Sequence, residues 1–101
     1  DSFSEGYGLA LLEDGAILVA GSVGEEGKRA AALFRFTATG TPDTDFEQNG
    51  VLVTEIGAGD DVLYDVVQEE NLFAAAGFTT VGNSREFLLM TYENATVVGQ
   101  R

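Results

Sequence analysis

The sequence of 101 residues contains no cysteine and no histidine. Without cysteine the chain forms no disulfide, holds no thiolate metal site and performs no thiol catalysis. Because histidine is missing too, most hydrolytic triads and the common transition-metal sites are excluded. The lack of cysteine does not decide the cellular compartment.

Proline is scarce as well, with one residue against 13 glycines. Together with abundant Val, Leu, Phe, Tyr and Thr, this composition favours short strands joined by turns. No apolar run approaches the roughly 20 residues that a membrane-spanning helix requires. The first residues also lack the basic end and apolar centre of a signal peptide. We therefore expect one small all-β domain over residues 1–101, with no insertion into a membrane.

Positively charged residues are also few. Only five lysines and arginines stand against 17 aspartates and glutamates, which gives a net charge of −12. A field of this sign repels phosphate backbones and anionic lipid surfaces, so we expect no nucleic-acid partner. Solubility or salty surroundings explain the surplus of acids, and attraction of cations or of a basic partner is the alternative.

Short apolar runs bounded by turn residues predict the strands. They cover residues 7–12, 17–20, 30–37, 51–55, 62–68, 72–76 and 86–92. The run at 30–37 is ambiguous, because its alanines favour helix and its alternating Phe34, Arg35 and Phe36 favour strand. Its counterpart later in the chain reads better as strand, so we predict strand here too. Residues 22–28, 57–61 and 79–84 are the expected variable loops.

The strongest local pattern is Glu-Asp-Gly-Ala-Ile-Leu-Val-Ala-Gly at residues 13–21. It predicts a tight type I′ turn and then a buried strand that ends at a glycine. A weaker copy lies 56 residues later, at 69–77, and the match extends without a gap over residues 6–36 and 62–92. The identical pairs are Glu13/Glu69, Ala20/Ala76, Gly21/Gly77, Arg29/Arg85 and Leu33/Leu89. A fixed period of this length indicates a repeat architecture.

Four short antiparallel strands per repeat, apolar on both faces, are typical of a β-propeller blade. A blade is covered on each side by its neighbours, so its strands lose the usual alternation of apolar and polar residues. A single β-sandwich of seven or eight strands is the alternative, since it has similar sequence features. The repeat favours the propeller.

Four segments carry a family resemblance: residues 14–21 (DGAILVAG), 33–36 (LFRF), 40–46 (GTPDTDF) and 49–51 (NGV). Together they resemble the delta-60 repeat of a bacterial β-propeller family. The resemblance covers essentially the whole chain, as one good copy and one decayed copy. It implies four-stranded blades, large secreted or surface proteins, and no established catalytic residues. We accordingly expect an extracellular, cell-surface or periplasmic location.

The chain departs from the family pattern at Ala16, at Glu47 and at residues 70–71, which read Glu-Asn in place of Asp-Gly. Residues 93–99 replace the long connection and the fourth strand, so the second unit is expected to be incomplete at its outer edge. The two blade-like units span about residues 6–56 and 62–101.

Two blades cannot close a propeller, which typically needs four to eight. The expected partners are therefore further propeller blades, supplied by the same longer protein or by other copies in a homo-oligomer. Collapse of the two units face to face into a sandwich-like domain is the remaining option.

Calcium is the one cofactor that the sequence suggests. The candidate ligands are Asp43, Asp45, Glu47, Asn49 and Glu55. Oxygen-bearing residues alternate from Asp45 onward and a glycine follows, as at positions 1, 3, 5 and 6 of a calcium-binding loop. Position 12 is Ile56, and the nearest carboxylate, Glu55, is one residue short. The alternative is a structural turn in which Asp43 ties the connection and Phe46 fills the interface between blades.

Tyr64 and Asp65 are the candidate ligand-contact residues. Asp65 lies in an otherwise apolar strand, where the first copy has Leu9. Because a buried carboxylate is costly without a partner, Asp65 is expected to face a solvated channel, to bind a backbone amide, or to contact a ligand beside the ring of Tyr64. Arg29 and Arg85 are expected to make a repeated contact with an acidic loop such as residues 25–26 or 60–61.

These observations favour a non-catalytic scaffold or interaction module. The acids at residues 13–14 and 69–70 lie at hairpin tips, where solubility explains them better than the carboxylate pair of a glycosidase. We therefore predict no enzyme activity, and variable loops held on a rigid frame. A calcium- or carbohydrate-binding surface domain is the alternative.

Overall fold

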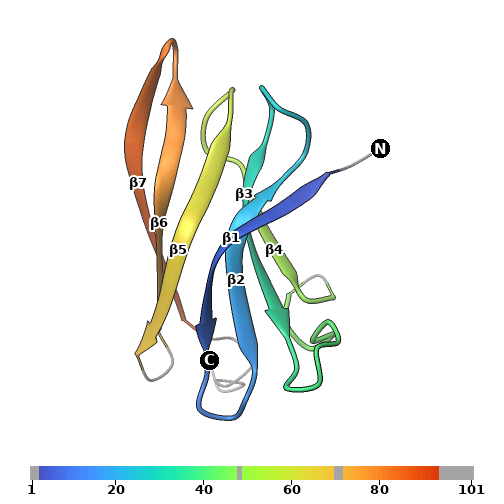
Figure 1. The fold of residues 1–101 in the computed structure, drawn as a ribbon. Helices are drawn as coiled ribbons and strands as arrows, with labels where there is room; N and C mark the ends of the chain where they lie inside the picture. Colours follow the sequence, from blue (N-terminus) through green and yellow to red (C-terminus); the bar gives the residue numbers. More distant parts are fainter. Residues whose placement is uncertain (1–2, 48, 70–71, 94–101) are drawn as a thin grey trace.

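The computed structural model describes residues 3–47, 49–69 and 72–93, which form two antiparallel sheets. In spatial order the first sheet contains β1 (Ser4–Leu11), β2 (Ile17–Val23), β3 (Ala30–Phe36) and β4 (Val51–Thr54). The second contains β5 (Asp61–Glu69), β6 (Leu72–Val81) and β7 (Ser84–Glu93). The all-β prediction is confirmed (Figure 1). The described residues include no helix that is long and apolar enough to cross a bilayer.

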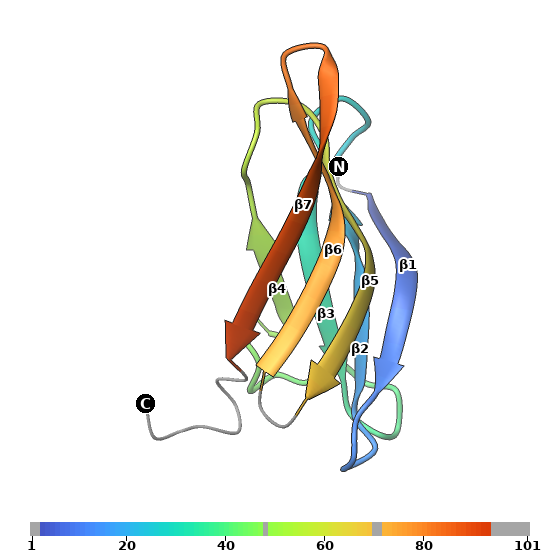
Figure 2. The same ribbon diagram turned by 90° about the vertical axis from the view of Figure 1, so that its left-hand side faces the viewer.

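The two sheets pack face to face as two layers (Figure 2). Strand β5 joins them, since it contacts β1, β2 and β3 of the first sheet. Within each sheet every strand pairs with the next one along the chain. Such meanders are typical of blades, whereas the connections of a Greek-key sandwich skip strands. The structure therefore agrees with propeller-type blades, the second of which has three strands within the described residues.

The seven predicted strands all form, including the ambiguous run that becomes β3. The prediction that Gly21 ends its strand was wrong, because β2 continues to Val23 and the repeat copy β6 continues past Gly77 to Val81. The expected loops at 22–28 and 79–84 are correspondingly shorter, namely residues 24–29 and the two-residue turn 82–83. The expected incomplete outer edge falls on residues 93–99, of which only the backbone of Glu93, at the end of β7, is described.

The first strand of each sheet carries a bulge at the same place. The pairing register shifts between Gly6 and Gly8 in β1, which leaves Tyr7 as the extra residue. In β5 the shift lies between Leu63 and Asp65, where Tyr64 is the extra residue. A bulge bends the strand and turns the extra side chain aside.

The bulges correct the repeat alignment. Tyr7 and Tyr64 are 57 positions apart, whereas the second and third strands keep the offset of 56. Asp65 therefore corresponds to Gly8 and not to Leu9. The sequence identity of Glu13 and Glu69 is no structural equivalence, because Glu69 still pairs with Leu72 inside the second sheet.

The hairpin turn between β1 and β2 also differs from the predicted type I′ turn. Gly15 has a φ of 90°, but Asp14 stays outside the left-handed region. The amide of Gly15 donates to the carbonyl of Leu12, and the amide of Leu12 donates to Ala16. These contacts make a three-residue connection with glycine in the left-handed position, the next commonest hairpin after the two-residue types.

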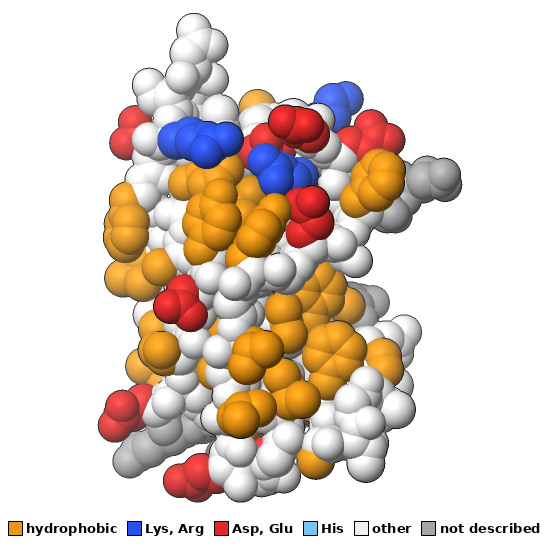
Figure 3. All heavy atoms as spheres, viewed as in Figure 1, with side chains coloured by type: hydrophobic (Ala, Val, Ile, Leu, Met, Phe, Trp, Pro, Cys, Tyr) orange, Lys and Arg blue, Asp and Glu red, His pale blue; other side chains and the backbone are white. Residues whose placement is uncertain are grey.

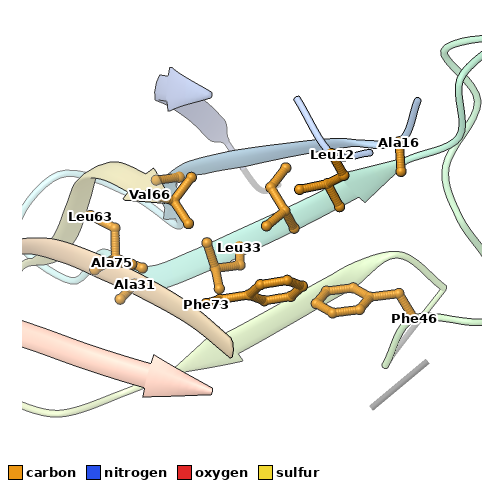
Figure 4. Close-up of a cluster of buried hydrophobic side chains, with 11 residues drawn as sticks. Leu12, Ala16, Ala31, Leu33, Phe46, Leu63, Val66, Phe73 and Ala75 are labelled. Atoms are coloured by element: carbon orange, nitrogen blue, oxygen red, sulfur yellow. The ribbon is translucent and has the colours of Figure 1, made fainter. Parts of the chain in front are cut away.

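The core lies between the sheets. Leu18, Ala20 and Leu33 of the first sheet are fully buried against Phe73 and its neighbours in the second. The ring of Phe46, from the connection between β3 and β4, lies end to end with that of Phe73 at a centroid distance of 6.4 Å (Figure 4). Phe46 therefore fills the interface between the two units, as predicted.

Candidate functional site

The connections at one end of the sheets are tied together by Arg29 and Asp60. The carboxylate of Asp60 accepts hydrogen bonds from the amides of Gly27 (2.7 Å) and Arg29 (2.9 Å), and from Nη2 of Arg29 at 3.0 Å. The hydrogen bond from the guanidinium holds the pKa of Asp60 at about 2, and the same bond raises the pKa of Arg29. The predicted contact of Arg29 with the acidic loop at residues 60–61 is confirmed.

A pocket lies beside this ion pair. Its volume is about 370 Å³, and its lining residues are Phe3, Glu5, Gly24, Glu26 and Arg29. Nη1 of Arg29 lies 3.5 Å from Oε1 of Glu5, so the guanidinium bridges the β1 carboxylate and the β4–β5 connection. The pocket thus combines an aromatic ring, two carboxylates and an arginine within the usual size range of small-ligand sites.

Asp61 is a buried carboxylate that the sequence interpretation did not single out. Its side chain accepts hydrogen bonds from the hydroxyl of Thr79 (2.6 Å) and from the amides of Ile56 (2.8 Å) and Gly57 (3.1 Å). With only 1% of its surface exposed, Asp61 fixes the connection that leads from the first sheet into the second. The sequence signal that could have indicated its role is an acidic residue directly before an apolar strand, with Thr79 at the facing position of the next strand.

Arg85 does not repeat the contact of Arg29. Within the described residues, its guanidinium lies over the ring of Phe78, 4.1 Å from the centroid. The first sheet has Ser22 in the place of Phe78, because the second strands correspond at an offset of 56. An arginine over an aromatic face is a cation–π contact, so the two arginines use different chemistry at equivalent positions.

Tyr64 and Asp65, the candidate ligand contacts, lie at the bulge of β5. The ring of Tyr64 is 45% exposed and its centroid lies 5.0 Å from that of Tyr7. Asp65 is exposed, and its Oδ1 accepts a hydrogen bond from the amide of Val66 at 2.9 Å. The carboxylate is therefore solvated and bound to an amide rather than buried. A ligand role for the two residues stays a prediction.

The five candidate calcium ligands occupy the connection after β3 and the residue after β4. Oδ2 of Asp43 lies 3.0 Å from Nε of Arg35, and its Oδ1 accepts a hydrogen bond from the amide of Asp45. The main chain is left-handed at Glu47 and Asn49, while Glu55 is an exposed residue following β4. Among the residues that the structure describes, no three acidic side chains come together to hold a metal ion. The site remains a prediction, in which Asp43 already has a cationic partner.

Arg35, like Asp61, is a buried charged residue whose role was not predicted from the sequence. Its side chain is 5% exposed and contacts Asp43 and, at 3.5 Å, the carboxylate of Asp14 in the hairpin turn. The amide of Asp43 also donates to the carbonyl of Arg35. Arg35 thus ties the long connection and the hairpin to the strand between them.

In a comparison with protein-family models, residues 12–46 match a β-propeller domain of unknown function (DUF5122). Residues 12–46 are therefore similar to a β-propeller repeat. The matched segment runs from the β1–β2 hairpin through β2 and β3, two of the four strands of the first sheet, to Phe46, whose ring contacts Phe73 of the second sheet. No curated protein and no solved structure matches the chain.

Proposed function

We propose that this chain is a non-catalytic β-propeller scaffold or interaction module of a secreted or cell-surface bacterial protein. The observation that carries the proposal is the grouping of connections at one end of two stacked sheets. The β2–β3 connection, the β4–β5 connection and the β6–β7 turn all lie at this end (Figure 1). We name it the loop end.

The loop end combines a rigid support with exposed charged side chains. Asp60 and Arg29 lock two of its connections together, and Asp61 anchors the base of one of them. Glu25, Glu26 and Lys28 are exposed above this frame. Binding residues are often carried on loops that a rigid scaffold positions, which is the arrangement expected of an interaction module.

A charge-swap variant of the loop end tests the proposal. We expect Glu25→Lys, Glu26→Lys and Lys28→Glu together to weaken binding to a bacterial cell-envelope fraction at least about tenfold, equivalent to about 1.4 kcal/mol. Glu13→Lys changes the net charge equally at the opposite end of the sheets and is the matched control, expected to bind like wild type. Thermal melting should show both variants folded. Equal binding by wild type and the loop-end variant would contradict the proposal.

A carbohydrate-binding surface domain is the second candidate, and the exposed pair Tyr7 and Tyr64 favours it. Because the chain has no tryptophan, its tyrosine fluorescence is directly observable. Titration with bacterial oligosaccharides should change this fluorescence in wild type and not in Tyr64→Ala. The calcium version of the same candidate predicts a higher melting temperature. At 100 times its dissociation constant calcium would add about 2.7 kcal/mol, or roughly 11–22 °C, to the wild type and much less to Asp45→Asn.

A further inference from the structure

The internal contact between the sheets uses opposite faces of two equivalent units. In the first sheet the buried side is that of Leu18 and Leu33, and in the second it is that of Phe73 and Ala75. Since β2 and β6 correspond at an offset of 56, Phe73 corresponds to Ile17, which points away from Leu18. The second sheet therefore stacks on the first as a translated and rotated copy, head to tail.

Head-to-tail stacking leaves one face of each sheet open. We name the outer face of the first sheet the front face; it carries Leu9, Leu11, Val19, Phe34, Phe36 and Val53. We name the outer face of the second sheet the back face; it carries Val67, Leu72, Ala74, Ala76, Phe87 and Leu89. The front face corresponds to the side that the second sheet buries, and the back face to the side that the first sheet buries.

The front face is apolar in a strongly acidic protein. Leu9 and Leu11 are 61% and 74% exposed, and Figure 3 shows hydrophobic side chains gathered over the first sheet. The charged residues of β1–β4 are Glu5 and Arg35, and both pair with residues whose side chains point to the other face, Ser22 and Leu18. A contiguous exposed apolar surface of this kind marks an interaction site in a soluble protein.

The back face exposes large apolar side chains on both of its edge strands, β5 and β7. Phe87 and Leu89 are 76% and 58% exposed, and Val67 is 60% exposed. Leu89 is the repeat counterpart of Leu33, which is fully buried in the first sheet at the internal contact. The back face of the second sheet is thus the repeat counterpart of the buried side of the first sheet. Within this chain, that buried side of the first sheet already packs against the counterpart of the front face on the second sheet. Asp65 and Glu69 also lie on the back face, along β5.

We propose that the front face of one copy of this chain packs on the back face of a second copy, continuing the internal stacking from chain to chain. The contact is heterologous, so successive copies form a ring when the rotation per copy closes and an open stack when it does not. The proposal rests on the blade faces and is independent of binding at the loop end.

Two surface variants test the direction of the contact. The front-blocked variant carries Leu9→Lys and Leu11→Lys, and the back-blocked variant carries Phe87→Lys and Leu89→Lys. All four positions are exposed, so these changes should leave the fold intact, as circular dichroism checks. Sedimentation velocity at physiological salt should show wild type associating as its concentration rises. Each variant alone should associate at least about 100-fold more weakly, because each loses two exposed apolar side chains of one face and places two charges there.

The decisive measurement is the equimolar mixture. It contains one intact front face and one intact back face, so the mixture should form a dimer at concentrations at which each variant alone is a monomer. The control is Ile56→Lys with Val81→Lys, which changes the charge equally at exposed apolar positions outside both faces and should associate like wild type.

Three results would overturn the proposal. One is a wild type that stays monomeric at every concentration. Another is a back-blocked variant that still self-associates while the front-blocked one does not, which indicates a symmetric front-to-front contact. The third is a mixture that stays monomeric. Should either variant fail to fold, Val53→Lys and Val67→Lys replace the blocked pairs and decide between the same outcomes.

Discussion

Single carboxylates join segments that lie far apart in the chain. Asp60 binds Arg29 from 31 positions earlier, and Asp61 binds Thr79 from 18 positions later. Each also accepts hydrogen bonds from backbone amides of a connection. The order of the loop end therefore depends on a few of the 17 acidic residues.

The pH dependence of stability should report the contact of Asp60. Its pKa is about 2 in the folded protein against an ordinary value of 3.8, so the ionised form favours folding. The contribution is complete above pH about 4 and disappears as the pH falls toward 2, because the protonated carboxyl loses the guanidinium. We expect Asp60→Asn to lower the free energy of unfolding by about 1 kcal/mol at neutral pH and by nearly nothing at pH about 2.

Urea unfolding at several pH values measures this difference. Asp45→Asn removes an equal charge from an exposed residue and should show no such pH-dependent difference. A constant difference between wild type and Asp60→Asn across the acid range would mean that the carboxylate acts through its shape and not through its charge.

The elements of each sheet are shaped by a bulge and a facing glycine. A Cβ at Gly21 would collide with the carbonyl oxygen of Glu5, and one at Gly77 with that of Val62. Neither glycine has a positive φ, so the backbone conformation does not require glycine at these positions. Glycine is required because the facing strand, β1 or β5, approaches too closely for a Cβ. The repeat keeps a glycine at both places for this reason, although neither glycine ends its strand.

A methyl group at this position should therefore be costly. Gly21→Ala is expected to lower the free energy of unfolding by about 1–3 kcal/mol, because a main-chain atom would have to move. Gly6→Ala is the comparison, since its Cβ would meet only the Cγ1 of Val19, at 2.7 Å, which can rotate on the half-exposed outer face. Chemical denaturation of the two variants measures both costs, and an equal cost would contradict the role of the Glu5 carbonyl.

The sequence predicted these elements well because apolar runs and turn residues are local signals. The strands, the repeat and the role of Phe46 follow from such patterns. The bulges at Tyr7 and Tyr64 could not be predicted, since the extra residue depends on how the facing strand pairs, and a gapless alignment at 56 hides a shift of one. Asp61 and Arg35 were missed for a related reason, because their partners come from distant connections that only the folded chain brings near.

At the scale of the whole molecule, two small sheets share one core. The radius of gyration is 13.3 Å, close to the value of about 13 Å expected for a single domain of 100 residues. Neither sheet alone has a second layer to cover its buried face, so the contact between the sheets is the source of hydrophobic stability. Phe46 lies at that contact with 2% of its surface exposed.

Phe46→Ala should therefore destabilise both sheets together. Removing a buried ring lowers the free energy of unfolding by about 3–5 kcal/mol. A typical domain has a free energy of unfolding of only about 5–15 kcal/mol, so this loss is a large part of it. Urea unfolding followed by circular dichroism and by tyrosine fluorescence should give one coincident transition at a lower midpoint, because Tyr92 of the second sheet packs against the same core. Phe87→Ala removes a ring that is 76% exposed and should cost about 0.5 kcal/mol or less in the monomer. Two separate transitions in wild type would show instead that each sheet unfolds on its own, and the shared core would then not be what holds the blades together.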